Sequence, residues 1–310
     1  MTRCPLCGQS GTTLHARARD IEYYTTDRTF DIRHCPTCEI LFVDPMLSSQ
    51  LGVIYPPSYY SFLEGSQNLV TAVKEWLDRR GMQRLTRSIS GQHLAVLDVG
   101  GGTGWLVDQV RSADPRFEHG FVIDIDEQAQ YVAVRKNYRY FLGRFEEFDP
   151  GAQKFDLILM LNLIEHVSDP RAVLEKAASM LAEGGVIWIK TPNFDSLDAR
   201  IFRDRSWAGF HTPRHFVIFK RESLERLAAQ CGMVVTSFAY TQGAPFWSVS
   251  LLDALRRLGM VNISSDRPAV YHPLNPILQA LTAAFDFARR PFGARLSQMV
   301  LTLRRSDTPK

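Results

Sequence analysis

Four cysteines near the N-terminus have the spacing of a metal site. Cys4 and Cys7 form one CxxC pair and Cys35 and Cys38 form a second, with 27 residues between the pairs. Thiolates from two such turns can converge on one tetrahedral zinc ion, and Gly8 supplies the tight backbone that the first turn needs. The alternative is two unrelated redox pairs, but neither pair stands between a strand and a helix, as a thioredoxin-type site does. The spacing predicts a zinc ribbon.

The predicted ribbon, residues 1–45, is expected to be structural. Four cysteine ligands leave a zinc ion no open position for chemistry, so the metal would hold the segment folded. Residues 21–24 and 30–33 read as short strands within it. Zinc ribbons often bind nucleic acid, yet this segment has a net charge of −1, whereas a nucleic-acid-binding ribbon is expected to be basic. The fifth cysteine, Cys231, is expected to be a buried, unreactive thiol.

A glycine-rich turn follows an apolar run in the middle of the chain. Residues 94–99 form a short run typical of a buried parallel strand, and Gly100, Gly102 and Gly104 come directly after it. A helix is predicted at 105–111. Glycine lets the backbone approach a ligand closely, and a helix N-terminus offers unpaired N–H groups. Together these features predict a nucleotide-binding segment, although the glycine pattern alone also occurs in dehydrogenases.

Further strands and helices must position this turn. Apolar strands are predicted at 120–123, 155–161 and 186–189. The first of them ends in Asp124, 26 residues after Asp98, where a carboxylate can accept hydrogen bonds from both ribose hydroxyls. Strands that alternate with helices predict an α/β fold with a parallel sheet covered on both faces, and its ligand is expected at the carboxyl ends of the strands.

These segments resemble the class I S-adenosylmethionine-dependent methyltransferases over about residues 91–240. The matching segments are 97–104, 122–126, 155–158 and 162–170. Asp98 stands two residues before the first glycine, where dehydrogenases normally have an apolar residue. The resemblance implies a Rossmann-like methyltransferase fold, with a mostly parallel seven-stranded sheet whose last strand is antiparallel. It also implies S-adenosylmethionine as the cofactor.

The resemblance implies roles for individual residues as well. The implied cofactor-binding residues are Asp98, Gly100, Gly102, Gly104, Asp124, Phe145, Glu146 and Asn162. Asp98 would orient the glycine loop and the amino-acid portion of the cofactor, or else be a satisfied loop carboxylate with no ligand. Asp124 would hold the ribose, Phe145 and Glu146 would contact the adenine, and Asn162 would begin the loop beneath the methionine portion.

The two ends of the chain fit a narrower resemblance. The cysteine ribbon, a linker rich in Tyr and Pro at 55–60 and the segment 209–219 are similar to a bacterial subfamily of sugar C-methyltransferases and enzymes encoded with polysaccharide assembly proteins. In that subfamily such a segment supplies the acceptor site. The implied reaction is methyl transfer to an oxygen or carbon atom of a small molecule, such as a sugar, a glycan precursor or a secondary-metabolite precursor.

An oxygen or carbon acceptor needs a base, and histidine titrates near neutral pH. Five of the eight histidines fall in predicted surface or linker segments, which leaves His166, His211 and His215. The last two are four residues apart in a loop that is expected to fold over the cofactor site. His215 is the first candidate for the base, with loop anchoring as its alternative. His166 could ligate a metal, but Asn162 stands where related quinone O-methyltransferases have glutamate, which argues against a catalytic metal.

The rest of the chain completes the predicted organisation. Residues 46–90 form a linker with a helix at 67–87, and the catalytic domain comprises 91–242 and 297–305, because 233–240 and 297–304 read as an antiparallel pair of strands. The insertion between them, 243–296, has predicted helices at 250–258 and from residue 275. It is expected to be a lid over the acceptor, a face for a membrane or a lipid-linked substrate, or a dimer face. The oligomeric state stays open.

Composition and charge limit the partners. The chain is 45% hydrophobic and 22% charged, as in globular proteins, and its net charge of +3 argues against non-specific nucleic-acid binding. Residues 251–310 carry +5, so peripheral membrane contact is expected there if anywhere. The N-terminus lacks the apolar core of a signal peptide, which predicts a cytoplasmic protein. The alternative function is an RNA-modifying methyltransferase, or an inactive nucleic-acid-binding module that uses the ribbon.

Overall fold

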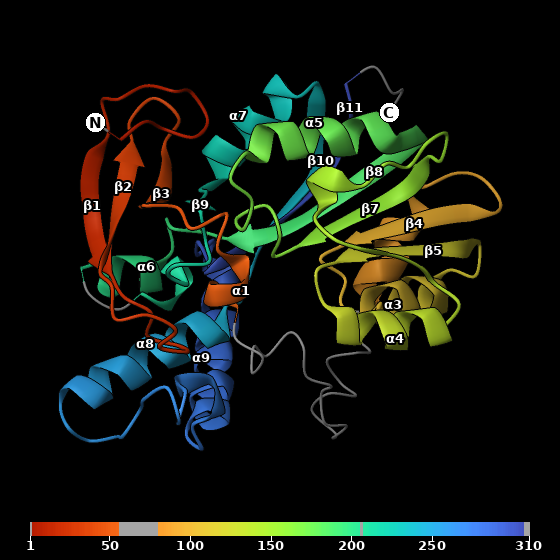
Figure 1. Cartoon of the computed structure of the whole chain (residues 1–310). Coiled ribbons are helices and arrows are strands. Elements are labelled where there is room, and N and C mark those ends of the chain that lie inside the picture. The colour runs from red at the N-terminus through yellow and green to blue at the C-terminus, as the bar shows by residue number, and fades with distance from the viewer. Residues whose placement is uncertain (1, 56–79, 205–206, 307–310) are drawn as a thin grey trace.

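A computed structural model describes residues 2–55, 80–204 and 207–306 of the chain (Figure 1). Its strands form a small N-terminal sheet and a large seven-stranded sheet. Residues 80–87 are helical up to the turn before the large sheet. The rest of the helix predicted at 67–87, and the linker beyond Tyr55, lie outside the described residues.

The large sheet has the strand order β10-β11-β8-β7-β4-β5-β6. Its strands are β4 (Leu94–Val99), β5 (Phe117–Asp124), β6 (Arg139–Leu142), β7 (Phe155–Leu161), β8 (Leu181–Pro192), β10 (Met233–Thr241) and β11 (Gln298–Arg305). The five strands from β8 to β6 are parallel, and β11 runs antiparallel to both β8 and β10. The predicted fold, a mostly parallel seven-stranded sheet with an antiparallel last strand, is confirmed.

Helices cover both faces of this sheet (Figure 1). They are α3 (Trp105–Ala113) and α4 (Glu127–Arg135) on one face, and α5 (Pro170–Met180) and α7 (Arg221–Gln230) on the other. Successive side chains of a strand point to opposite faces, so Leu94 and Val96 of β4 join the core under α3 and α4, while Leu97 and Val99 join the core under α5 and α7. This two-sided burial is why β4 is apolar along nearly its whole length.

The small sheet has the order β1-β2-β3-β9. Its strands are β1 (Thr13–Ala18), β2 (Phe30–Cys35), β3 (Ile40–Asp44) and β9 (Val217–Ile218). Because β9 comes from the segment 209–219, the catalytic chain itself completes the N-terminal sheet, and the two parts share one apolar core. The short helix α1 (Leu51–Ile54) follows the small sheet and lies between it and the insertion (Figure 1).

The strand predicted at 21–24 is wrong. The carboxylate of Asp20 accepts hydrogen bonds from the backbone N–H groups of Glu22, Tyr23 and Thr25, and these bonds close the chain into a turn. The strand at 30–33 is confirmed within β2, which pairs with β1 on one side and β3 on the other. The turn directs residues 20–24 toward the catalytic part of the molecule.

The chain between β10 and β11 forms two long helices, α8 (Ala244–Arg257) and α9 (Asn275–Arg289), which pack on each other. The second helix begins where predicted, but the first starts six residues earlier, because Pro245 fits the first turn of a helix. A short helix, α6 (Leu197–Ile201), and a separate apolar core that includes Ile21 and Leu252 lie beside them.

The basic charge of this insertion is partly compensated within it. Arg256 and Arg257 both pair with the buried carboxylate of Asp253, and Arg289 pairs with Asp286. Helix α9 nevertheless leaves Leu281 63% exposed and Ile277 57% exposed. No helix among the described residues is long and apolar enough to cross a membrane. Contact of this insertion with a membrane, a lipid-linked substrate or a second copy stays a prediction.

Candidate functional site

A pocket of about 860 Å³, its open mouth included, lies at the carboxyl ends of β4 and β5. The residues that line it are Leu51, Tyr55, Val99, Gly100, Ile123, Asp124, Ile125, Gly143, Arg144, Phe145, Glu146, Asn162, Leu163, His166 and Val167. Five of the predicted cofactor residues therefore meet in one place, together with one of the three candidate histidines.

The glycine loop shapes this pocket. Gly100, Gly102 and Gly104 all have positive φ values, of 73°, 49° and 74°, which side-chain-bearing residues rarely adopt. A Cβ on Gly104, where α3 begins, would also lie 2.7 Å from the ring of Tyr138. Only Gly100 lines the pocket directly. Gly102 and Gly104 contribute through their backbone conformation, which gives the loop its shape.

Asp124 ties the loop to the end of β5. One carboxylate oxygen accepts the N–H of Gly102 at 2.8 Å, and the other accepts the N–H of Asp126 at 3.1 Å. Burial raises the pKa of this carboxyl, and the backbone hydrogen bonds oppose that shift. Each oxygen can accept further hydrogen bonds, so Asp124 can also bind hydroxyl groups of a ligand in the pocket.

Asp98 lies beneath the loop rather than in the pocket wall. Its side chain is 1% exposed, and neither carboxyl oxygen has a hydrogen-bond partner among the described residues. Burial, and to a lesser degree the charge of Asp124, raise its pKa to about 8. A buried carboxyl without a partner is costly, and such groups are usually satisfied by a ligand or by water. Its position fits a ligand that brings an N–H donor or a positive charge to the loop.

The three candidate histidines form one cluster, and His166 is the member that lines the pocket. The ring centroid of His166 is 4.6 Å from that of His215 and 5.9 Å from that of His211, and the last two rings are 4.8 Å apart. Nδ1 of His166 lies 2.8 Å from the hydroxyl of Tyr55 and 3.1 Å from the carbonyl of Arg214. The loop at 209–219 thus folds against the strand-end motif, as predicted.

The environments of these rings differ. Burial lowers the pKa of His166 to about 3 and holds that of His215 well below its usual value. Nδ1 of His215 is 2.9 Å from the carbonyl of Gly209, so this ring anchors the loop, which was the alternative to its role as base. His211 differs from both, because its Nδ1 lies 2.5 Å from a carboxylate oxygen of Glu22.

Glu165 brings a carboxyl to the same cluster. It is fully buried, accepts a hydrogen bond from the hydroxyl of Thr191 at 2.9 Å, and has its second oxygen 4.0 Å from Nε2 of His215. Burial raises its pKa to about 8, so it is largely uncharged at neutral pH. Glu165, His166 and His215 are close enough for one ion, but Asn162 contributes no carboxylate to the group, and we derive no step through a metal here.

Sequence reasoning missed several residues of this site. Glu22 and Asp20 come from the turn after β1, Arg214 from the histidine loop, and Tyr55 from the end of α1, where the linker begins. Asp20 and Arg214 form a fully buried ion pair at 2.7 Å across 194 residues of sequence. The position of Arg214 next to His215 was a usable signal. Glu22 carried none, because nothing local pairs it with a histidine.

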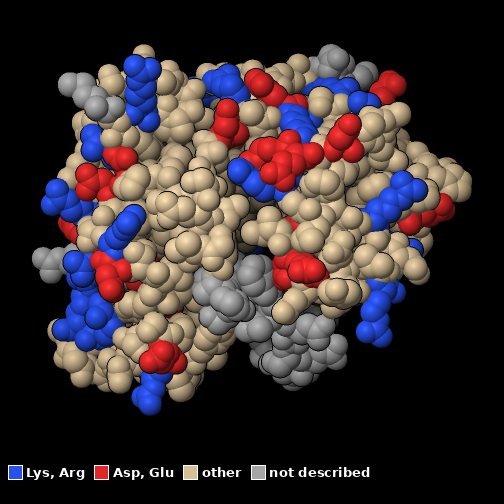
Figure 2. Space-filling model, viewed as in Figure 1, with Lys and Arg blue, Asp and Glu red and all other residues tan. Residues whose placement is uncertain are grey.

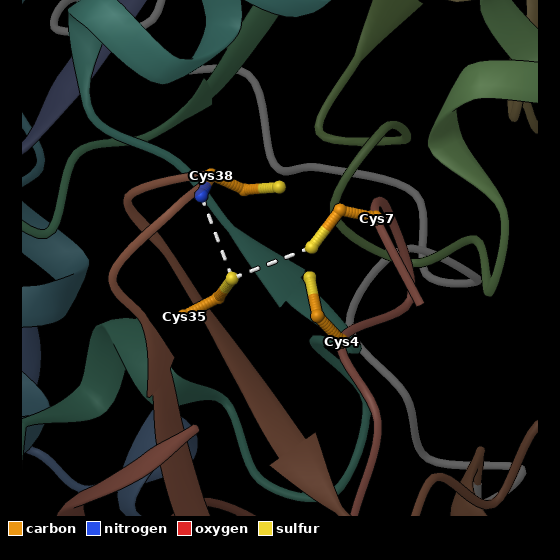
Figure 3. A group of neighbouring side chains, drawn as sticks. All are labelled: Cys4, Cys7, Cys35 and Cys38. Atoms are coloured by element: carbon orange, nitrogen blue, oxygen red, sulfur yellow. Dashed lines mark hydrogen bonds between the residues drawn. The ribbon is translucent and has the colours of Figure 1, made fainter. Parts of the chain in front are cut away.

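The four predicted cysteine ligands converge at the tip of the small sheet (Figure 3). Their sulfur atoms all lie within 4.8 Å of one another, and those of Cys7 and Cys35 are 3.7 Å apart. Four sulfurs at about 2.3 Å from a tetrahedral zinc ion would be about 3.8 Å apart, so the cluster fits such an ion. Gly8 has the left-handed φ of 71° that the first turn requires. Cys231 lies apart from the cluster, and burial raises its pKa to about 11.

Comparison with known proteins agrees with the fold. Residues 72–237, more than half of the chain, match a family model described as a methyltransferase domain. The chain belongs to this methyltransferase-domain family, which confirms the predicted class of protein. The sugar-associated subfamily is not confirmed by this match.

Curated relatives share part of the chain. A ubiquinone biosynthesis O-methyltransferase of Coxiella burnetii is 30% identical over 115 residues, which cover 34% of this chain and 46% of that protein. One of Rhizobium etli is 28% identical over 166 residues, covering 50% of this chain and 64% of that protein. The match therefore spans less than two thirds of the length of these relatives.

Solved structures resemble the chain at low identity. The N-methyltransferase NodS of Bradyrhizobium japonicum, in complex with S-adenosylhomocysteine, is 13% identical, with a TM-score of 0.46 over 82% of this chain and 95% of that one. The [4+2]-cyclase SpnF is 15% identical, with a TM-score of 0.49 over 78% of this chain and 84% of that one. Likeness at this level carries no argument about the reaction.

Proposed function

We propose that this protein transfers the methyl group of S-adenosylmethionine to an oxygen or carbon atom of a small molecule, with a sugar or glycan precursor as the first class to test. One observation carries the proposal. The pocket that holds Gly100 and Asp124 at the strand ends is lined on its inner side by His166, the nearest member of the histidine cluster. Five predicted cofactor-binding residues and one member of the histidine cluster therefore share one pocket.

The described residues fit this cofactor. When bound, S-adenosylmethionine supplies a methyl group on a cationic sulfonium, so the protein contributes mainly proximity and orientation. Asp124 would accept the ribose hydroxyls, and Phe145 and Glu146 would contact the adenine. Asp98, buried and without a partner, would favour the positively charged amino-acid portion beside the loop. Asn162 lies on the pocket wall where the methionine portion is expected.

The nature of the acceptor follows from the histidine cluster and from the relatives. A group of three imidazoles, of which His211 and His215 are buried, is useful where the acceptor must lose a proton, as a hydroxyl or a carbon acid does. The curated relatives are named as O-methyltransferases, which favours oxygen. RNA is the weaker candidate, because a nucleic-acid-binding protein is expected to carry a continuous basic surface. On the face drawn in Figure 2, basic and acidic side chains are interspersed, and one basic group lies over the insertion at the lower left.

The proposal is tested with S-adenosylmethionine labelled in its methyl group. The protein is incubated with nucleotide sugars, lipid-linked glycans, a simple phenol such as catechol, and RNA, and the labelled product is identified. We expect label in a small molecule that bears a hydroxyl or an acidic C–H group. Label only in RNA would replace this proposal with the nucleic-acid alternative.

We also propose that the four-cysteine cluster holds a structural zinc ion. The convergence of the four sulfur atoms supports this. Cys4 and Cys35 are buried in the shared core, which would make the metal part of the folded state.

Metal analysis of the purified protein should find about one zinc ion per chain. Cys35→Ser removes a buried ligand, so we expect it to lose the metal and to unfold at a lower temperature. Cys231→Ser is the matched control, and it should keep both the zinc ion and the wild-type melting temperature. A zinc content near zero in protein that retains its native melting temperature would refute the assignment.

A further inference from the structure

The turn after β1 reaches from the ribbon into the catalytic part of the molecule. Asp20 accepts the N–H groups of Glu22 and Tyr23, at 3.2 Å and 3.0 Å, and so fixes the direction of the chain there. Glu22 is only 6% exposed, and its carboxylate lies 2.5 Å from Nδ1 of His211. A buried carboxylate from the N-terminal unit is thus bonded to a histidine of the catalytic loop.

A second contact holds these two segments in place. Arg214 lies three residues after His211, and its guanidinium pairs with Asp20 at 2.7 Å while donating from Nε to the carbonyl of Ile54, also at 2.7 Å. The same guanidinium lies 4.8 Å from the centre of the Tyr23 ring. Because the ion pair is fully buried, the turn and the histidine loop are held as one unit.

The three histidines are unequal as proton acceptors. A base gains a positive charge when it takes a proton, and a buried imidazolium needs a nearby negative charge. Nδ1 of His166 faces a tyrosine hydroxyl and a carbonyl, and Nδ1 of His215 faces a carbonyl. Among the described residues, a carboxylate lies within hydrogen-bond distance of His211 alone of the three, since the Glu165 carboxyl is 4.0 Å from Nε2 of His215. This is the arrangement that fixes one tautomer and stabilises the charged ring in enzymes that use a carboxylate with a histidine.

We propose that His211 is the general base of the methyl transfer and that Glu22, supplied by the ribbon, is its positioning residue. This rests on the proposed function. As the acceptor oxygen bonds to the methyl carbon, the carbon–sulfur bond breaks and its electron pair stays on sulfur, which leaves S-adenosylhomocysteine uncharged. The hydroxyl proton moves to Nε2 of His211, and Glu22 stabilises the resulting imidazolium until the proton passes to solvent.

The other groups around His211 do not replace Glu22. His166 and His215 are held neutral by burial, the Arg214 guanidinium is taken up by Asp20, and the ring of Tyr23 lies edge-on to His211 at 6.4 Å. Glu165 approaches His215 rather than His211, and its raised pKa leaves it largely uncharged. The proposal also makes the ribbon part of the active site, since it supplies the carboxylate.

Nuclear magnetic resonance tests the contact without an acceptor. In full-length protein labelled with ¹⁵N-histidine, we expect one low-field Nδ1–H signal that disappears in His211→Gln. Glu22→Gln should remove or strongly shift that signal, while Asp31→Asn, which alters an exposed ribbon carboxylate, should leave it unchanged. An identical His211 signal in Glu22→Gln would overturn the positioning role.

Turnover tests the role in catalysis, with catechol as the probe acceptor. Glu22→Gln should lower kcat about 100-fold while KM and S-adenosylhomocysteine affinity stay within about threefold. The difference in kcat between Glu22→Gln and the wild type should become smaller as the pH approaches about 10, because a phenol ionises there and needs no base. Unchanged kcat would refute the proposal. Absence of S-adenosylhomocysteine binding by the wild type would refute the proposed function, and would leave the resonance result standing as a separate finding.

Discussion

Arg214→Leu is expected to reduce the free energy of unfolding by about 3–5 kcal/mol, since it leaves the carboxylate of Asp20 charged and buried without its partner. The two side chains are both fully buried and their charged atoms are 2.7 Å apart. Urea denaturation measures the loss. The double variant Asp20→Asn, Arg214→Leu should recover part of it, because the unpaired charge is then absent.

Arg226→Leu is the matched control. Its guanidinium pairs with Glu39 at 2.9 Å, but the arginine side chain is 44% exposed, and exposed pairs contribute about 0–1 kcal/mol. A loss in Arg214→Leu no larger than in this control would show that the buried pair does not hold the ribbon to the catalytic loop.

The buried pair of Asp20 and Arg214 also predicts that the stability of the protein depends on pH. Burial alone would raise the pKa of Asp20, but the charge and hydrogen bonds of Arg214 outweigh it and lower the pKa to about 2. A carboxyl whose pKa is lower in the folded state than in the unfolded state stabilises the fold at pH values above both. This contribution is therefore expected to disappear as the pH falls from about 4 to about 2.

Asp124→Ala is expected to weaken S-adenosylhomocysteine binding about 10- to 100-fold. The variant loses a carboxylate in the pocket wall, and hydrogen bonds to a charged group contribute about 1.5–3 kcal/mol. It also loses the bond from the N–H of Gly102, so the glycine loop becomes less well fixed. Isothermal titration measures the affinity.

Glu127→Gln is a suitable control for that variant, because it alters an exposed carboxylate on α4 only three residues away. It should bind with wild-type affinity. If Asp124→Ala also bound with wild-type affinity, the ribose-binding role of Asp124 would be wrong.

Much of the catalytic sheet could be predicted from sequence because its signals are local. The apolar run of β4, Asp98 and the glycines that follow lie within a few residues of one another, and Asp124 directly follows the apolar run of the next strand. The cysteine pairs were equally informative, since their spacing limits what the chain between them can do. Burial on both faces explains why β4 is apolar apart from Asp98.

The acceptor side of the site could be predicted only in part. The histidines were found because few residue types accept protons near neutral pH, but choosing among them needed their partners. His215 was the first candidate, and its Nδ1 contact with Gly209 instead favours anchoring. The partner of His211 is Glu22, 189 positions earlier in the chain, in a segment that sequence alone assigned to a strand. Only tertiary packing through Asp20 and Arg214 brings them together.

Titration of the wild-type protein with S-adenosylhomocysteine tests the central claim most directly, because both the pocket assignment and the role of the histidine cluster depend on this cofactor. We predict one binding site per chain with a dissociation constant in the micromolar range, about −8 kcal/mol. At about 1 mM S-adenosylhomocysteine, even a site with a binding free energy of about −4 kcal/mol would be half occupied. The account would be contradicted if the titration at that concentration gave no detectable heat and no shift in melting temperature.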